Sequence, residues 1–503
     1  MRENIKLLYI DLFCGAGGTS SGVEYARMDG RKCAKVIACV NHDRNAILSH
    51  QANHPHTLHF TEDIRTLELS PMVRHLQKMK AEYPKARVVL WASLECTNFS
   101  KAKGGQPRDA DSRTLAEHLF RYIEALQPDY IQIENVEEFM CWGALDEYGK
   151  PVSKDKGSDY LRWVRNVCSY GYKFDWRILN AADFGAYTSR KRFFGQFARK
   201  WLPIAFPVQT YAKNGDEGGL FKMYKKWKPV RAVLDLDDDG ESIFAKKKPL
   251  CEKTLERIYA GLVKFVAGGK KQHEAWILKY NSMNKDHSHN APSIDEPCPT
   301  VACQNRLGLV KCQFLSKQFS GDPSGKNVCL EQPAGSITCK DHHAFVTAYY
   351  GNGFNSSIED PSPTVTTSDR MALVTAHYLM NPYSFKSDGG SIDKPCFTLI
   401  ARMDKMPPYL ITTKEGLFGI AIYETDSAWT RKIKEFMTMY GIMDICMRML
   451  KIDELKRIMG FPSDYILIGT QAEQKKFIGN AVEVNMSRVL CEALCLKLSK
   501  RKE

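Results

Sequence analysis

Val88–Ser100, VVLWASLECTNFS, is the stretch on which the fold prediction depends. It begins with an apolar run, Val88–Trp91, and passes abruptly into small and polar residues that include one cysteine, Cys96. This pattern predicts a buried parallel strand that opens into a loop at its carboxyl end, where open α/β sheets place their chemistry. A thiol there can be a nucleophile if its surroundings stabilise the thiolate, although a lone cysteine is more often an inert, buried residue.

The composition is that of an ordinary globular protein. The chain has 503 residues, of which 44% are hydrophobic and 26% charged, so it is long enough for two or three domains. We find no apolar run of about eighteen residues and no signal-peptide pattern, and expect a cytoplasmic protein without a membrane span. The sixteen cysteines include no CxxC pair, which argues against zinc and against a disulfide framework, so no metal is expected. The net charge of +13 suits a polyanionic partner.

A second apolar run, Leu7–Phe13, breaks into the glycine-rich stretch Cys14–Gly22, and a helical pattern follows from about Val23 to Met28. A strand, a glycine turn and a helix N-terminus together let a ligand approach the backbone and meet unpaired N–H groups. The alternative is a tight βα turn without a ligand. The glycine spacing does not give the G-x-G-x-x-G of dinucleotide-binding dehydrogenases.

Further strand-like runs alternate with helical patterns such as Arg113–Leu126. The runs are Val36–Val40, Thr57–Phe60, Arg87–Ala92, Tyr130–Ile133 and Asp175–Leu179. This alternation predicts an α/β fold with a doubly wound, mostly parallel sheet, whose carboxyl-end loops share one edge. Besides the glycine loop and Cys96, that edge should carry Asn41, His42, Asp43, Glu62, Asp63, Ile64, Glu134 and Asn135.

Four of the charged residues have both a functional and a purely structural interpretation. Asp63 either accepts hydrogen bonds from an adenine amine or caps a helix N-terminus. Glu134, at the end of an apolar strand, is either a helix-start residue or a partly buried acid with a function. Arg190 and Arg192 share a face of an extended segment. They either hold a phosphate or a carbonyl oxygen, or they are ordinary solvated charges.

A repeat follows a Lys-rich, irregular stretch that contains one helical pattern, Leu255–Val266. Each of its four units has an acidic residue, a proline, and a Ser or Thr three residues later; the prolines are Pro297, Pro333, Pro361 and Pro395. Each unit predicts a turn that leads into a short strand. The units form either a small duplicated β domain or a surface that faces nucleic acid. The second interpretation rests on basic residues at matching places: Arg306, His342, His343, Arg370 and Arg402.

The end of the chain returns to helical patterns. Helices are predicted at Lys434–Met449 and Ile452–Met459, and a turn at Gly460–Pro462. A last amphipathic helix, expected to begin at Gly479 and Asn480, could close back onto the sheet.

Six blocks, in order along nearly the whole chain, resemble the DNA (cytosine-5)-methyltransferases. The D-x-F-x-G-x-G-G loop of that family is similar to residues 11–18 (DLFCGAGG), and its Pro-Cys loop to residues 94–100 (LECTNFS). The remaining blocks correspond to residues 134–136 (ENV), 188–192 (TSRKR), 458–462 (IMGFP) and 479–482 (GNAV). Any one block is modest evidence, whereas six in order are specific.

The chain departs from the family pattern beside the nucleophile and at the cofactor. Glu95 stands in place of the proline before Cys96, and Thr97 in place of the usual glutamine after it. Thr188 replaces the glutamine of the arginine block, and Asn41 lies about where the family keeps an acid for the cofactor ribose. These changes indicate a divergent bacterial or phage branch, since Cys96 and the other family catalytic residues are present.

The resemblance implies a catalytic domain at residues 1–205, a β-rich target-recognition region at 206–430, and a C-terminal segment, 431–503, that returns to the catalytic domain. It implies methyl transfer from S-adenosylmethionine to C5 of a flipped-out cytosine. The implied catalytic residues are Cys96, Glu134, Asn135, Arg190 and Arg192. The implied cofactor-binding residues are Asp11, Phe13, Cys14, Gly15, Ala16, Gly17, Gly18, Asn41, His42, Asp63, Ile64, Asn480, Ala481 and Val482. The expected DNA contacts are Ser100, Arg306, Arg370 and Arg402.

The expected partner is double-stranded DNA, with a cognate restriction endonuclease as a possible companion and a monomer as the expected state. Two other functions stay open. One is the same chemistry on tRNA, which the large repeat-bearing insert argues against. The other is a non-catalytic DNA-binding protein on a methyltransferase scaffold, whose support is the changed residues beside Cys96.

Overall fold

The computed structural model describes most of the residues in the N-terminal and C-terminal parts of the chain, and short stretches between them. The described residues are 4–94, 116–144, 152–153, 155–215, 224–235, 237–263, 275–279, 293–294, 296–300, 307–314, 345–348, 355–357, 371–374, 379–380, 409–410, 420–440 and 442–500. Seven residues predicted as functional lie outside them, namely Cys96, Ser100, Arg306, His342, His343, Arg370 and Arg402.

The chain divides into two compact units. The first comprises residues 1–238, 292–307 and 449–503, and the second residues 239–291 and 308–448. The domain boundaries predicted from the sequence, after residues 205 and 430, stay predictions. Within the described residues, no helix combines the length and the apolar character that a membrane span requires.

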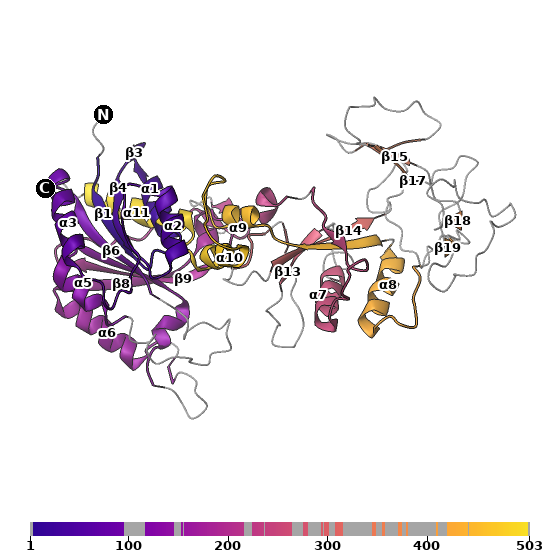
Figure 1. Cartoon of the computed structure of the whole chain (residues 1–503), viewed down its shortest axis with the longest axis horizontal. Coiled ribbons are helices and arrows are strands. Elements are labelled where there is room, and N and C mark those ends of the chain that lie inside the picture. The colour runs from indigo at the N-terminus through magenta and orange to yellow at the C-terminus, as the bar shows by residue number, and fades with distance from the viewer. Residues whose placement is uncertain are drawn as a thin grey trace. The chain divides into compact units, whose positions relative to one another are not determined.

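A seven-stranded sheet forms the centre of the first unit (Figure 1). In spatial order its strands are β5 (Leu58–Phe60), β4 (Ala34–Val40), β1 (Leu7–Leu12), β6 (Arg87–Ser93), β7 (Tyr130–Asn135), β9 (Lys191–Arg199) and β8 (Tyr172–Asn180). All neighbours pair in parallel except β9, which is antiparallel to both β7 and β8. The predicted doubly wound, mostly parallel sheet is confirmed.

Helices cover both faces of this sheet because its buried strands are apolar on both sides. On β1, Leu8 and Ile10 pack into a core with side chains of α3 (Ser70–Glu82), α5 (Leu119–Leu126) and α6 (Ser158–Ser169). Leu7 and Tyr9 alternate with them and face a second core, which α1 (Gly18–Tyr25) and α11 (Val484–Ser499) complete. The C-terminal helix α11, yellow in Figure 1, thus returns to the N-terminal strands, as predicted.

Two predicted helix boundaries near the glycine loop and at the C-terminus are wrong. The first helix begins at Gly18 instead of Val23, and Arg27–Met28 forms the short strand β2, paired with β3 (Arg31–Lys32). Gly479 and Asn480 end a helix, α10 (Gln471–Asn480), instead of beginning one. The last helix, α11, begins after them, where the Glu483 carboxylate accepts hydrogen bonds from the backbone nitrogens of Asn485 and Met486. This carboxylate cap defines the helix start.

The second unit contains helices α7 (Glu252–Leu262) and α8 (Ala428–Tyr440) on a four-stranded sheet of order β12-β20-β14-β13. These strands are β12 (Glu241–Ser242), β20 (Ile442–Met449), β14 (Leu307–Phe314) and β13 (Ala275–Lys279). The helix predicted over residues 434–449 is therefore only half right, because its second part is strand β20. Pairing with β12 and packing of Ile445 in the core outweigh the helical propensity of this Met-rich segment.

A strand lies at the end of each proline-centred repeat, as predicted. The first repeat ends in β14, the second in β15 (Phe345–Ala348), the third in β17 (Met371–Val374) and the fourth in β19 (Tyr409–Leu410). Strand β15 pairs antiparallel with β17 and with β16 (Asn355–Ser357), and β19 pairs with β18 (Leu379–Met380). The repeats thus contribute β structure, as the predicted β-rich region requires.

Close packing of α1 against α11 leads to a stability prediction. A Cβ at Gly22 would collide with the Ser487 hydroxyl and the Val484 carbonyl, and would lie 2.8 Å from the Arg488 backbone nitrogen. We expect Gly22→Ala to lower the free energy of unfolding by roughly 1–3 kcal/mol, because the overlap outweighs the gain in helix propensity of about 1 kcal/mol. Urea unfolding measures this. The prediction fails if the variant unfolds at the wild-type midpoint.

Candidate active site

Glu134 and Asn135 are the last two residues of β7, at the carboxyl edge of the sheet. All six residues of this strand are buried, so the end of a buried apolar strand carries a carboxylate. The Glu134 side chain is only 7% exposed, and its Oε1 lies 3.4 Å from Nε of Arg192. A buried carboxylate usually requires such a partner. Of its two interpretations, the structure therefore gives Glu134 that of a buried, paired acid.

Asn135 connects the end of β7 to the end of β6. Its Nδ2 donates to the Leu94 carbonyl over 3.3 Å, and its Oδ1 accepts from the Val136 backbone nitrogen over 2.8 Å. Leu94 is the last described residue before Cys96. Asn135 therefore fixes the position of Leu94, two residues before the predicted nucleophile.

Arg190 and Arg192 have different partners. Arg190 is buried, and its NH1 donates to the Gly479 carbonyl over 3.1 Å, at the end of α10. Arg192 contacts Glu134, and its NH1 also donates to the backbone carbonyl of Lys191. In this structure, Arg190 positions the C-terminal segment, whereas Arg192 belongs to the Glu134 pair.

The glycine loop joins β1 to α1 with residues in the left-handed region. Phe13 has φ 60°, Gly15 φ 53° and Gly17 φ 104°. A Cβ at Gly17 would collide with the Tyr465 hydroxyl, and one at Gly18 with the Val482 carbonyl. Gly15 alone of these three has nothing within 4 Å of the Cβ position. Internal packing thus requires Gly17 and Gly18, and Gly15 marks the open side of the loop.

Asp11 lies completely buried at the end of β1, before this loop. Its Oδ2 accepts a hydrogen bond of 2.8 Å from the Ser20 hydroxyl, and its Oδ1 has no hydrogen-bond partner among the described residues. Burial raises the pKa of this carboxyl well above its usual range. The loop thus offers one unsatisfied buried acceptor beside an open glycine.

The polar residues after β4 and β5 are engaged in local turns. The Asn41 side chain accepts from the Asp43 backbone nitrogen over 2.9 Å, and Asp43 caps α2 (Arg44–Asn53). The Asp63 carboxylate binds Arg65 through Nε and NH2, and these hydrogen bonds lower the pKa of Asp63 to about 2. No helix begins at Asp63, so the alternative that it caps a helix is wrong.

The remaining predicted cofactor residues lie in three places. Ala16 is buried in the glycine loop, and its carbonyl accepts from the Tyr465 hydroxyl. Ile64 is buried beside Asp63, whereas His42 follows Asn41 after β4. Asn480 ends α10, and Ala481 and Val482 follow it, with the Val482 carbonyl against Gly18. The C-terminal segment and the glycine loop are therefore in contact, as a shared site requires.

Several residues around the loop were missed from the sequence. Tyr465 contacts the loop, and the Ser20 hydroxyl is hydrogen-bonded to Asp11 and lies 2.9 Å from His50 Nε2. Cys14 of the loop lies near Cys39 and His50. No local pattern gives the first contact, since Tyr465 and Ala16 are 449 residues apart in the chain. The return of the C-terminal segment brings Tyr465 to the loop, whereas tertiary packing within the N-terminal part brings Cys39 and His50 to Cys14.

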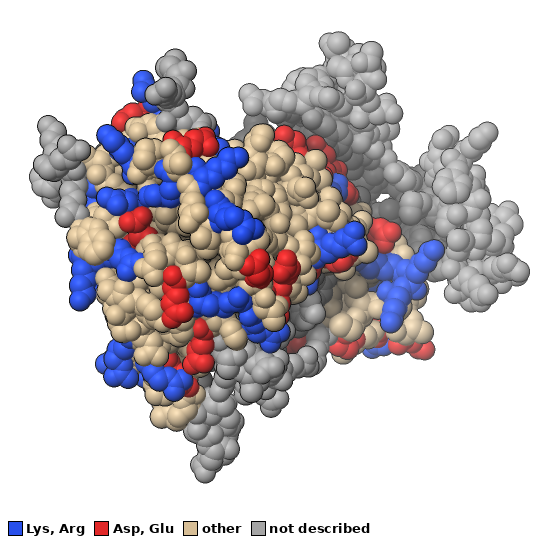
Figure 2. All heavy atoms as spheres, turned by 60° about the vertical axis from the view of Figure 1, so that its left-hand side comes forward, with Lys and Arg blue, Asp and Glu red and all other residues tan. Residues whose placement is uncertain are grey.

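Charges of both signs cover the face of the first unit drawn in Figure 2. Blue lysine and arginine side chains are interspersed there with red aspartate and glutamate. On the described part of this face, the lysines and arginines therefore do not form a patch of positive charge alone, although the net charge of the chain is +13.

This arrangement is the Rossmann-like methyltransferase fold: a mostly parallel sheet with one antiparallel strand, a glycine loop after the first strand, and here a buried acid at the end of a central one. The family model "C-5 cytosine-specific DNA methylase" matches residues 7–289 and 399–495. The chain therefore belongs to the C-5 cytosine-specific DNA methylase family.

Curated relatives resemble this chain at modest identity. The type II methyltransferase M.XorII of Xanthomonas oryzae is 28% identical over 205 residues, 40% of this chain and 43% of the relative. The type II methyltransferase M.BspRI of Lysinibacillus sphaericus is 28% identical over 245 residues, 46% of this chain and 53% of the relative. The chain spans about half the length of the curated relatives it matches. A DNMT2 mutant from Spodoptera frugiperda is similar in structure, with a TM-score of 0.47, 12% identity, and 97% and 99% of the two chains covered.

Proposed function

We propose that this protein is a DNA cytosine-5 methyltransferase that acts on a flipped-out cytosine in a specific DNA sequence. The observation that carries this proposal is the buried Glu134–Arg192 pair, with 3.4 Å between Oε1 and Nε, at the strand end where Asn135 also holds Leu94. A paired acid at that strand end suits acid–base chemistry on a base ring.

Cys96 would supply the nucleophile. Unaided cytosine C5 is not nucleophilic enough to accept a methyl group. Addition of the Cys96 thiolate to C6 forms an S–C6 bond and moves electron density to C5. Departure of the C5 proton and of the Cys96 sulfur then restores the aromatic ring, which now carries the new methyl group.

Glu134 would act on N3 of the same ring. As thiolate addition places negative charge on the ring, a carboxyl that donates a hydrogen bond or a proton to N3 offsets that charge. Arg192 holds Glu134 at the strand end and would contact the O2 edge. Arg190, bound to the Gly479 carbonyl, would act only indirectly, by positioning residues 479–482.

The glycine loop suits a small polar cofactor. Gly15 has open space at its Cβ position, and Asp11 Oδ1 is a buried acceptor without a hydrogen-bond partner among the described residues. S-adenosylmethionine supplies the methyl group when bound. Phe13–Gly18, with Asn41 and His42 at the rim, would hold it. Asp63 would reach the adenine amine only if Arg65 released one carboxylate oxygen.

The target base has to leave the duplex, at a cost of a few kcal/mol, so both of its flanks need to be held. The repeat-bearing β region is the candidate for that grip and for reading the sequence, through Arg306, Arg370 and Arg402, with Ser100 beside the nucleophile. We further propose action as a monomer in a reducing cytoplasm, with a cognate restriction endonuclease as companion.

Covalent trapping tests the chemistry. DNA with 5-fluorocytosine at the target cannot lose the C5 substituent, so wild-type protein with S-adenosylmethionine should form a complex that survives denaturing electrophoresis. Cytosine DNA of the same sequence is the control and should give none. Binding without a trapped complex would favour the alternative of a non-catalytic DNA-binding protein.

The second alternative, tRNA methylation, is tested by competition. Unlabelled duplex DNA containing the target should suppress labelled methyl transfer, whereas an excess of tRNA should not. The reverse result would assign the same chemistry to tRNA.

A further inference from the structure

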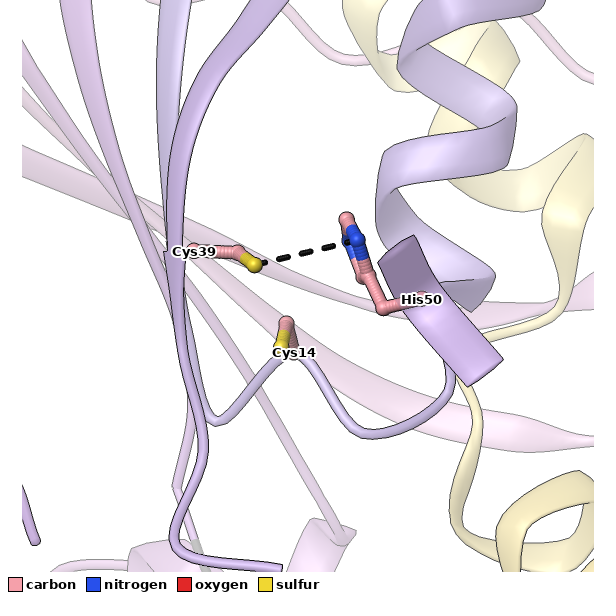
Figure 3. Close-up of side chains that lie close together, drawn as sticks. All are labelled: Cys14, Cys39 and His50. Carbon is pink, nitrogen blue, oxygen red and sulfur yellow. Dashed lines mark hydrogen bonds between the residues drawn. The ribbon is translucent and has the colours of Figure 1, made fainter. Parts of the chain in front are cut away.

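Two cysteines and a histidine converge behind the glycine loop (Figure 3). Cys14 comes from the loop, Cys39 from β4 and His50 from α2, and all three are buried. The two Sγ atoms and a ring nitrogen of His50 lie within 4.8 Å of one another, and Cys39 Sγ is 3.7 Å from His50 Nδ1. Figure 3 shows the Cys39 sulfur directed toward the His50 ring, with Cys14 below them.

The other ring nitrogen of His50 is held by a hydrogen-bond chain. Ser20 donates its hydroxyl proton to Asp11 Oδ2 over 2.8 Å, and His50 Nε2 lies 2.9 Å from the same Ser20 oxygen. Because the Ser20 proton is used toward Asp11, Nε2–H of His50 is the donor in the second bond. The lone pair of Nδ1 then faces the sulfur atoms. Metal-binding histidines are typically oriented in this way by a carboxylate behind the ring.

The separation of sulfur and nitrogen in this cluster suits a metal ion. In a tetrahedral zinc site, bonds of about 2.3 Å to sulfur and about 2.0–2.1 Å to nitrogen separate S and N ligands by about 3.6 Å. The distance of 3.7 Å between Cys39 Sγ and His50 Nδ1 approaches this value. Nε2 of His59, from β5, is hydrogen-bonded to His50 Nδ1 at 3.0 Å, so an ion bound by Nδ1 would replace that hydrogen bond.

We propose that Cys14, Cys39 and His50 bind one zinc-class divalent metal ion. Two thiolates and one imidazole are donors that zinc prefers, and a tetrahedral ion would take its fourth ligand from outside this cluster. The ion would hold the glycine loop against β4 and α2. The sequence expectation of no metal rested on the missing CxxC pair, whereas these ligands come from the glycine loop, β4 and α2.

Metal analysis with matched cysteine variants tests the proposal. The full chain, made without a histidine tag in zinc-supplemented medium and cleared of loosely bound metal, should contain about one zinc per chain. Cys39→Ser should lose that zinc. The control is Cys491→Ser, which removes a thiol from the second buried cluster, Cys33, Cys491 and Cys495, and should retain it. Zinc lost from Cys491→Ser and kept in Cys39→Ser would overturn the assignment.

Cobalt substitution keeps the test independent of whether Cys39→Ser folds. Wild-type protein refolded with Co²⁺ should show a thiolate-to-cobalt charge-transfer band and the visible bands of a tetrahedral ion. Cys491→Ser should give the same spectrum. Wild-type protein that purifies without zinc and gives no such bands would refute the site, and would leave a hydrogen-bonded Cys–His cluster in its place.

Discussion

Cys96→Ala is expected to abolish formation of 5-methylcytosine while leaving S-adenosylmethionine binding unchanged. Without the thiolate no S–C6 bond forms, and C5 never gains the electron density to accept a methyl group. The glycine loop lies between β1 and α1, so we expect it to bind the cofactor without this side chain. Labelled methyl transfer to DNA and calorimetric titration with S-adenosylmethionine measure the two properties separately.

The matched control for this variant is Cys168→Ala. Cys168 is a half-buried thiol on α6, which packs on the sheet face opposite α1 and α11. Its replacement removes the same chemical group from a helix that the proposed chemistry does not use, and should leave the methylation rate within a small factor of wild type. Retained methylation in Cys96→Ala would refute the covalent mechanism.

Glu134→Gln is expected to lower kcat by about 10²–10⁴-fold, the usual contribution of a general acid or base. The substitution keeps the shape and a hydrogen-bond acceptor for Arg192, but removes the proton donor for N3. Because Glu134 is 6% exposed, the loss of a buried charge also leaves Arg192 without its counter-ion, so thermal stability has to be measured alongside. Single-turnover methyl transfer reports the chemical step directly.

Glu137→Gln provides the matched control for this second variant. Glu137 lies three positions further along the chain, in a short 3₁₀ helix, and is exposed. The same change of charge there should leave kcat near the wild-type value. If Glu134→Gln retained the wild-type single-turnover rate, Glu134 would have only a structural role in the pair with Arg192.

The sheet could be predicted because short local sequence patterns indicate each of its strands. An apolar run such as residues 88–91 or 130–133 is buried on both faces, and short polar loops follow at its carboxyl end. The segment 442–449 shows the limit of this reasoning. Its methionines and isoleucines fit a helix by composition, and pairing with β12 and β14 makes it a strand.

Site residues could be predicted where a charged side chain ends an apolar strand, because burying a charge without a partner is costly. Contacts between segments that are distant in the chain could not be predicted. Glu134 at the end of an apolar strand indicated a buried acid, and the structure gives it Arg192 as partner. The glycines were correctly placed in a loop, but Gly17 and Gly18 are required by Tyr465 and Val482, from the other end of the chain. The Cys14–Cys39–His50 cluster likewise depends on tertiary packing alone.

The most direct test of the central claim is the product of methyl transfer. Purified protein, labelled S-adenosylmethionine and duplex DNA of mixed sequence are incubated, and the DNA is digested to nucleosides that are resolved by chromatography. The account predicts label in 5-methyldeoxycytidine, with sequencing of the methylated positions revealing one recognition sequence. Label in N4-methyldeoxycytidine or N6-methyldeoxyadenosine, or DNA that binds without acquiring label, would contradict it.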